Sequence, residues 1–543
     1  MKIARTGLPL CLWAFAGCVA AADPEAIAEG LKKIQVRDLQ ADLTFLASGA
    51  LEGRLSLRQG SEAAIAWIAS EFLKAGLAPA AGGSYLQRVP LIEFRPDNGD
   101  LRLTIGRGRE SRTFRHPDIS ASFPEDLKVD AGVAFAGYGI TAPELAYDDY
   151  AGLDVHGRIV LVFDHEPQET DPRSIFLGTG NTRYATSRVK ALNAQRRGAA
   201  ALLVGPEPNR KHPTNQERMA RIPGSEQRRG RLPSQAIEGD ELRIPVVTVN
   251  DTVTRELLAV AGRSPSELQS AIDASLKPSS QVLAGVRAEF RYANRERRRG
   301  HSANVAGLLE GSDPRLREEY IIYSAHHDHD GTTESGGVYH GADDDGSGTV
   351  GVVALARAFG ANRVKPRRST VFLVFAAEER GLLGSYYYAQ QPLWSLEKTR
   401  AVVNFDMIGR NEADSDQTKG LIEIAPDTSN EMNLIGTKYC PAYRKTVEAA
   451  NEHVGLRLNY KWDEEAALNI YFRSDQFPFA LKDVPAVWWF TGFHPDYHQT
   501  TDTVDRIHFE KMARILALAY RTGWEFGDGE PPSFVAGPAV GRR

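Results

Sequence analysis

Short apolar runs in the second half of the chain end repeatedly in a histidine or a carboxylate, and this pattern constrains the fold most. The strand-like runs are 320–324, 370–376, 401–405 and 484–490, and helical patterns occupy 348–359 and 509–526. Strands that alternate with helices indicate an α/β fold, with a mostly parallel or mixed sheet and helices on both faces. Because sites in such sheets lie beyond the carboxyl ends of the strands, we expect the polar residues there to meet.

Five of these polar residues form a candidate ligand set: His326, Asp343, Glu379, Asp406 and His498. Two imidazoles and three carboxylates suit a pair of divalent metals that share one bridging carboxylate. Two metals held a few ångströms apart can activate a water and hold a carbonyl or phosphoryl oxygen. The sequence therefore favours a hydrolytic enzyme over a scaffold.

The string Gly341-Ala-Asp-Asp-Asp-Gly-Ser-Gly348 is the most distinctive of these segments. Three consecutive acids are costly unless they are solvated or neutralised by cations. We expect Asp343 to bridge the two metals. An acidic surface turn is one alternative. A calcium loop is another, but it would need alternating oxygen ligands and a distal glutamate, which are absent.

Residues beside the ligands have expected roles of their own. Asp328 lies two positions after His326, so both can share one face of an extended chain, and Asp328 can hold the second ring nitrogen. We assign Glu378 as the general base and its neighbour Glu379 as the metal ligand. Tyr497 can donate a hydrogen bond to a developing oxyanion.

Residues 113–283 have a different texture, with short β-type runs between glycines and prolines. They predict a separate β-rich or α/β module without chemistry of its own. We expect Arg210–Arg231 to be an exposed loop. His156, His165 and His212 lack partners at ligand spacing, so we expect them on the surface.

The first 22 residues form a separate unit. Lys2 and Arg5 precede a short apolar run, 8–19, and the small residues 20–22 follow it. This is typical of a secretory signal and predicts an exported chain, periplasmic or extracellular. A buried N-terminal helix is one alternative, and lipid attachment through Cys18 is another. No later stretch reaches the length of a transmembrane helix.

Charge and cysteine content limit the partners and the covalent framework. The formal net charge is −5, which gives no basic footprint for nucleic acid or an anionic membrane. Cys440 is the single cysteine after the signal, so no internal disulfide is expected. Stability must come from a large core and from bound metal.

Five motifs occur together in one order along 301–507. They are Ala-His-x-Asp, Gly-Ala-Asp-Asp-Asp-Gly-Ser-Gly, Ala-Ala-Glu-Glu-Arg-Gly-Leu-Leu-Gly-Ser, Asn-Phe-Asp-Met-Ile-Gly and Pro-Asp-Tyr-His-Gln. In this combination the chain resembles the di-zinc aminopeptidase family of secreted zinc exopeptidases. The string Leu46–Arg54 is similar to the N-terminal segment of that family. Residues 149–162 resemble the protease-associated domain that is often inserted in it.

The resemblance implies a division of the ligands. One zinc would take His326 and Asp406, the other would take Glu379 and His498, and Asp343 would bridge them. Cobalt or manganese could replace zinc. The resemblance also implies that Glu378 moves a proton from the water to the leaving amine, that Tyr497 stabilises the oxyanion and that Arg473 lies near the substrate carbonyl. Gln476 departs from the family pattern, which often has histidine there, and His327 stands where an aromatic residue is common.

The same resemblance suggests domain limits and a substrate class. The expected units are a signal peptide at 1–22, the first part of the peptidase domain at 23–112, a protease-associated insert at 113–283, the di-zinc core at 284–526 and a disordered tail at 527–543. Peptides are the implied substrates, and aminopeptidase activity is the first hypothesis. A glutamate-type carboxypeptidase, a one-zinc glutaminyl cyclase and a receptor-like relative with a decayed site are the alternatives. The oligomeric state stays open.

Overall fold

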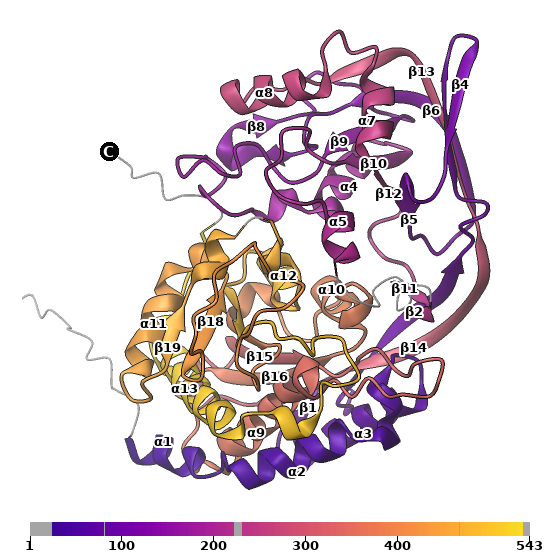
Figure 1. The fold of residues 1–543 in the computed structure, drawn as a ribbon. Helices are drawn as coiled ribbons and strands as arrows, with labels where there is room; N and C mark the ends of the chain where they lie inside the picture. Colours follow the sequence, from indigo (N-terminus) through magenta and orange to yellow (C-terminus); the bar gives the residue numbers. More distant parts are fainter. Residues whose placement is uncertain (1–23, 81, 222–230, 466, 536–543) are drawn as a thin grey trace, which may run out of the picture.

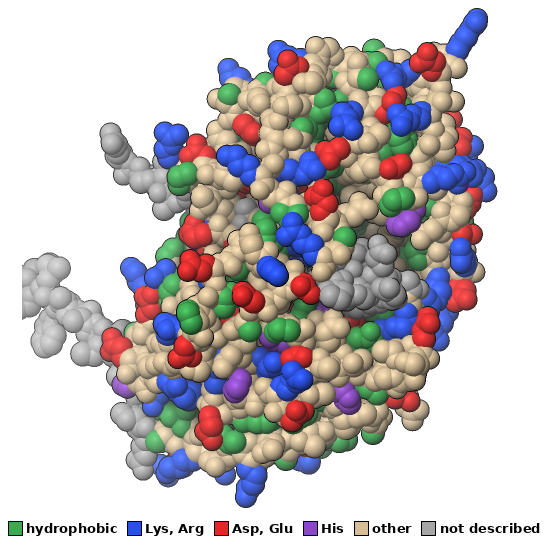
Figure 2. Space-filling model, in the orientation of Figure 1, with side chains coloured by type: hydrophobic (Ala, Val, Ile, Leu, Met, Phe, Trp, Pro, Cys, Tyr) green, Lys and Arg blue, Asp and Glu red, His purple; other side chains and the backbone are tan. Residues whose placement is uncertain are grey.

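The computed structural model describes residues 24–80, 82–221, 231–465 and 467–535. The expected signal at 1–22 and Cys18 lie outside these residues. Within them the chain forms two large sheets, one in the lower part and one in the upper part of Figure 1, and a two-stranded sheet of β7 Thr141–Ala142 and β8 Tyr147–Asp148. No helix of the described residues is long and apolar enough to cross a membrane. Lysines, arginines and acids are interspersed over the face in Figure 2, in keeping with the mild net charge.

The lower sheet has ten strands, and its centre is parallel. Its order is β11-β2-β14-β16-β15-β17-β20-β18-β19, and β1 also pairs with β14. The bounds are β1 Ala78–Pro79, β2 Leu86–Pro96, β11 Ser234–Ile237, β14 Asn294–Leu309, β15 Tyr320–His326, β16 Ser369–Phe375, β17 Thr399–Phe405, β18 Glu431–Ile435, β19 Arg457–Asn459 and β20 Ala486–Phe490. Strands β16, β15, β17 and β20 run parallel, whereas β14 and β18 are antiparallel to their neighbours in this group. The mixed α/β sheet predicted from the sequence is confirmed.

Helices cover both faces of this sheet. On one face lie α1 Pro24–Leu31, α2 Val36–Leu46, α3 Gln59–Lys74, α9 Gly348–Ala361, α11 Pro441–Asn451 and α13 Phe509–Asp528 (Figure 1). The other face carries α10 Leu383–Gln390 and α12 Gln476–Ala480. Helix α9 is almost entirely apolar, as suits a helix that lies between the sheet and the outer helices; its one charged residue, Arg357, forms ion pairs with Asp42 of α2 and Glu71 of α3. The α9 residues Val350, Leu355 and Phe359 are each fully buried.

The upper sheet has eight strands in the order β4-β3-β13-β6-β9-β10-β12-β5. The bounds are β3 Arg102–Arg107, β4 Glu110–Phe114, β5 Ile119–Ala121, β6 Leu127–Phe135, β9 Ile159–Phe163, β10 Ala201–Gly205, β12 Val246–Val249 and β13 Gln281–Tyr292, with helices α4 Ser187–Arg196, α5 Asn215–Ala220, α7 Asp251–Leu258 and α8 Pro265–Ser275. This sheet has its own core, so the separate module expected from the sequence is present, and we call it the insert. It begins at β3, before residue 113, and β11 leaves it to pair with β2.

Long strands connect the two parts. Strand β13 of the insert is followed by β14 of the lower sheet, and β2 pairs with β14 along most of its length (Figure 1). Phe534, near the last of the described residues, also packs against the lower part. The ring of Phe534 stacks on Tyr439, at 5.5 Å between ring centroids, so residues before 536 are held in place there.

Arg54 ties the N-terminal segment to the strand ends of the lower sheet. Its side chain is buried and donates hydrogen bonds of 2.8 Å to four carbonyl oxygens, those of Leu46, His327, His340 and Gly341. Burial lowers the pKa of this guanidinium, and nearby carboxylates, first that of Asp345, oppose the shift. The guanidinium therefore serves both as a donor and as a buried positive charge.

Replacing Arg54 tests this role. We expect Arg54→Lys to lower the free energy of unfolding by about 3 kcal/mol, because an ammonium cannot reach four acceptors and the carboxylates lose a fixed partner. The midpoint of thermal unfolding measures the effect. Arg37→Lys is the matched control, because the Arg37 side chain is 89% exposed. Equal midpoints for the two variants would contradict the assignment.

Candidate metal centre

The parallel strands bring the predicted residues together at one edge of the lower sheet. His326 ends β15, Glu378 and Glu379 follow β16, and Asp406 follows β17 directly. His498 lies in the loop after β20. Because β15 pairs in parallel with β16 and β17, and β17 with β20, all these positions lie beyond carboxyl ends of neighbouring strands.

Two ligand groups share one carboxylate. His326, Asp344 and Asp406 form one group, and Asp344, Glu379 and His498 form the other, with the potential ligand atoms of each group within 4.8 Å of one another. The two oxygens of Asp344 face different groups: Oδ1 lies 3.5 Å from His326 Nε2, and Oδ2 lies 3.1 Å from His498 Nε2. Asp344 thus has the position of a bridge.

The choice of Asp343 as the bridge is corrected by this geometry. Asp343 Oδ1 accepts hydrogen bonds from the backbone N–H of Gly409 at 2.7 Å and from the hydroxyl of Ser347 at 3.0 Å. Its Oδ2 lies 3.1 Å from Nε2 of His494. Asp343 therefore holds the surrounding loops and points away from both groups.

The third acid of the string, Asp345, organises the turn. Its carboxylate accepts from the backbone N–H of His326 at 3.0 Å, of Gly348 at 3.0 Å and of Met407 at 3.2 Å. A Cβ on residue 348 would lie 2.3 Å from Asp345 Oδ1, so only glycine fits there. One carboxylate thus connects the ends of β15 and β17 to the start of α9.

Asp328 lies behind the ligands. Its carboxylate accepts from the backbone N–H of Glu378 at 2.9 Å and of Glu379 at 3.3 Å. Its Oδ1 is 3.7 Å from His326 Nδ1, and its backbone oxygen is 3.2 Å from the same nitrogen. Asp328 therefore fixes the backbone of both glutamates as well as the imidazole ring.

Sequence reasoning missed two residues that support the second group. Asp330 Oδ2 lies 2.9 Å from His498 Nδ1, and Asp330 Oδ1 accepts from Arg380 at 2.5 Å. His329 Nδ1 lies 2.8 Å from Glu379 Oε1. Asp330 follows His326 and Asp328 at the same spacing of two, so its position was a usable signal: an extended chain places every second residue on one face. His329 falls between these positions, and this alternation gave no signal for it.

The residues expected near the substrate also meet. Arg473 Nη2 lies 3.4 Å from the Tyr497 hydroxyl, and the guanidinium carbon lies 5.4 Å from the centroid of the Phe493 ring. The Arg473 Nη1 atom is buried and has no hydrogen-bond partner among the described residues. Burial, as the first cause, raises the pKa of Tyr497, so its hydroxyl stays protonated and can donate.

His327 and Gln476, the two residues that depart from the family pattern, are both buried. His327 points away from the ligand groups, and its Nε2 lies 3.0 Å from the carbonyl oxygen of Ala303. Burial lowers the pKa of His327 to about 4. Gln476 donates to the carbonyl oxygen of Tyr471 at 2.6 Å and accepts from Asn404. Neither side chain belongs to the two ligand groups.

The electrostatics of the centre favour bound cations. Burial raises the pKa of Glu378 well above its usual range, and the neighbouring carboxylates, first that of Asp406, add to this shift. Burial opposes ionisation of Asp344, but the imidazoles of His498 and His326 hold its pKa well below its usual range. The Nε2 atom of His326 is buried without a hydrogen-bond partner among the described residues. A cation between these groups would complete the coordination, so the residues fit divalent metals.

Comparisons with known proteins show which proteins the chain is similar to. The family model described as "Peptidase family M28" matches residues 304–522. Aminopeptidase NAALADL1 of Mus musculus is 32% identical over 178 residues, which cover 30% of this chain and 22% of that protein. Leucine aminopeptidase 2 of Arthroderma otae is 26% identical over 260 residues, covering 43% of this chain and 46% of that protein. The chain thus spans less than half of these two relatives.

A solved structure extends the likeness to both sheets. The aminopeptidase from Aneurinibacillus sp. strain AM-1 aligns over 94% of this chain and 98% of its own, with a TM-score of 0.50 and 20% sequence identity. At this identity the comparison supports the fold alone. The α/β sheet and the second sheet therefore occur together in another protein.

Proposed function

We propose that this chain is an aminopeptidase with two metals, from the premise that its residues 304–522 match the model of peptidase family M28. The observation that carries the proposal is Asp344, whose two oxygens face two separate ligand groups. His326 and Asp406 would hold one zinc, and Glu379 and His498 would hold the other. The bound metals would supply Lewis-acid chemistry: they lower the pKa of a water and polarise the scissile carbonyl.

The chain's own residues account for the proton transfers. Glu378 Oε2 lies 3.7 Å from His326 Nε2, beside the first ligand group, and carries no ligand role in either group. Its raised pKa suits a base that takes a proton from the attacking water and passes it to the leaving amine nitrogen. Asp328 would position Glu378 and His326, as its hydrogen bonds support.

Tyr497 and Arg473 would act on the substrate carbonyl. The Tyr497 hydroxyl can donate to the oxyanion that forms when water attacks the carbonyl carbon. Arg473 holds that hydroxyl and has a further donor, Nη1, for the substrate. We also propose export of the chain, supported by the sequence of residues 1–22.

Arg473 also favours a second candidate, a carboxypeptidase. A buried guanidinium nitrogen without a hydrogen-bond partner is suited to a carboxylate as well as to a carbonyl oxygen. In that case the C-terminal carboxylate of a peptide would bind beside Tyr497. The position of the cleaved bond separates the two candidates.

Peptides blocked at one end make this distinction. We expect cleavage of a peptide with a free N-terminus and a blocked C-terminus, and no cleavage of the reverse peptide. A chelator should abolish the reaction, and zinc should restore it. Mass spectrometry of the products measures both. Cleavage of the reverse peptide alone would move the protein to the carboxypeptidases.

The bridge can be tested through metal content. Asp344→Asn removes a charge shared by both groups, so we expect loss of the zinc bound at this centre. Asp343→Asn is the matched control, and it should keep this zinc, because Asp343 faces backbone donors and His494. Elemental analysis after dialysis counts the metal. The reverse pattern would restore Asp343 as the bridge.

The base can be tested with metal in place. We expect Glu378→Gln to keep its zinc and to lose turnover by about 100-fold or more, because an amide cannot take the proton. Glu397→Gln, at an exposed position, should leave kcat unchanged. A kcat of Glu378→Gln within a few-fold of the wild-type value would show that Glu378 is not the general base.

A further inference from the structure

Two histidines and two glutamates of the insert form a second, partly buried group, far along the chain from the strand-end ligands. They are His165, Glu169, Glu207 and His212, and their potential ligand atoms all lie within 4.8 Å of one another. The sequence-based expectation that His165 and His212 lie on the surface is wrong. His165 is 4% exposed, and the two rings stack with centroids 4.4 Å apart. Loops that follow β9 and β10 bring the four side chains together.

The spacing of the donor atoms suits a single small cation. His165 Nδ1 lies 2.7 Å from Glu169 Oε2 and 3.6 Å from Glu207 Oε1. His212 Nε2 lies 2.9 Å from Glu169 Oε1. Tetrahedral zinc with ligands at about 2.0 Å requires donor atoms about 3.3 Å apart, which is within the range seen here.

Two donor atoms of this group lack hydrogen bonds. Glu207 is 3% exposed, and its Oε1 has no hydrogen-bond partner among the described residues. His212 Nε2 is also buried and forms no hydrogen bond, although Glu169 is close. Buried carboxylate and imidazole atoms without hydrogen bonds are costly. Both atoms point toward His165 and Glu169, where a cation would satisfy them.

We propose that His165 Nδ1, His212 Nε2, Glu169 and Glu207 bind one divalent metal ion of the zinc class, separate from the strand-end centre. Two imidazole nitrogens with two carboxylates match the ligands that zinc prefers, whereas calcium and magnesium prefer oxygen alone. The four residues also form a closed set of four ligands, which is the arrangement of a structural site.

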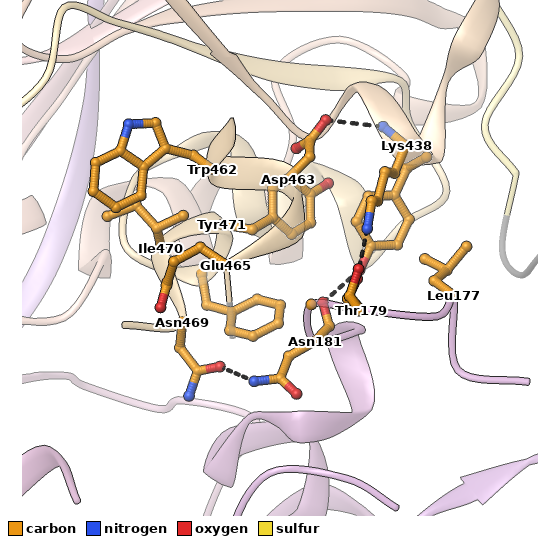
Figure 3. A pocket seen from close by; sticks show the side chains of 13 residues that line it. Leu177, Thr179, Asn181, Lys438, Trp462, Asp463, Glu465, Asn469, Ile470 and Tyr471 are labelled. Atoms are coloured by element: carbon orange, nitrogen blue, oxygen red, sulfur yellow. Dashed lines mark hydrogen bonds between the residues drawn. The ribbon is translucent and has the colours of Figure 1, made fainter. Parts of the chain in front are cut away.

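The surroundings give this metal a structural role. His165 Nε2 lies 2.9 Å from the side-chain amide of Asn469, which belongs to the lower part of the molecule. Figure 3 shows Asn469 beside Asn181 of the insert, and the two amides are hydrogen-bonded. If the side-chain amides of Asn181 and Asn469 both exchanged their oxygen and nitrogen positions, the Asn469 oxygen would accept from His165 Nε2–H. The hydrogen bond between the two amides would remain. That outer contact is usual for a metal-bound imidazole.

The contact between His165 and Asn469 lies close in the chain to Arg473, a proposed substrate residue. Asn469 directly precedes the short helix Ile470–Phe472, and Arg473 follows it. Lys190 of the insert also donates to the backbone oxygen of His165 at 2.6 Å. A metal that fixes the His165 ring would thus fix the contact between the insert and the segment that carries Arg473.

Metal content tests the site directly. The full mature chain is stripped with a chelator, reloaded with zinc, dialysed and analysed for zinc per chain. We expect Glu207→Gln, an isosteric change, to hold about one zinc fewer than wild type, or to bind that zinc about 10-fold to 100-fold more weakly. His156→Gln is the matched control, because His156 is an exposed histidine of the insert. Equal zinc content in all three proteins would overturn the proposal and leave the group as histidine–glutamate ion pairs.

Measurements in the Asp344→Asn variant separate this site from the strand-end centre. In Asp344→Asn we expect about one zinc to remain, and in Asp344→Asn with Glu207→Gln we expect none. Zinc should raise the unfolding temperature of the first protein and not of the second. If Asp344→Asn holds no zinc and gains no thermal stability from it, the insert site is refuted, whatever the fate of the peptidase proposal. This measurement decides the question even if Glu207→Gln fails to fold.

Discussion

The lower part of the molecule depends on how it accommodates buried negative charge at one edge of its sheet. Asp328, Asp343, Asp345 and Asp502 are each fully buried there, beside the ligand carboxylates. Backbone N–H groups neutralise much of this charge: Asp345 receives three, and Asp502 accepts from the N–H groups of Asp343 and Asp344. Arg54 supplies one fixed cation from the N-terminal segment. The remaining charge faces the space between the two ligand groups, where divalent metals would neutralise it.

The sequence was sufficient to predict the four parallel strands at the centre of the lower sheet and the edge at which the polar residues meet. Each of the four predicted strand runs overlaps a strand, namely β15, β16, β17 and β20, and the polar residues after them lie at the expected edge. This works because the parallel strands of one sheet end on the same side. The resemblance to a peptidase family could add roles because it depends on short local motifs, which the matched segment 304–522 contains.

The sequence could not choose among three adjacent aspartates. The turn around Asp344 and Asp345 departs from helical backbone angles, and this departure decides which carboxylate faces the metals. Residue spacing carries no information on such a turn. The histidines of the insert were missed for a different reason. His165 follows β9, whereas Glu207 and His212 follow β10, and only the folded sheet of the insert makes these two loops neighbours.

The joint between the two sheets has a mechanical consequence. Pro96 of β2 pairs with Asn294 of β14, so the chain leaves the lower sheet and returns to it at adjacent points. In topological terms the insert is an enlarged hairpin loop, apart from β11, which returns to the sheet edge. A two-stranded ribbon bends readily out of its plane, but sliding one strand past the other breaks the whole ladder of hydrogen bonds. Any motion of the insert relative to the lower sheet should therefore be a bending of this ribbon out of its plane.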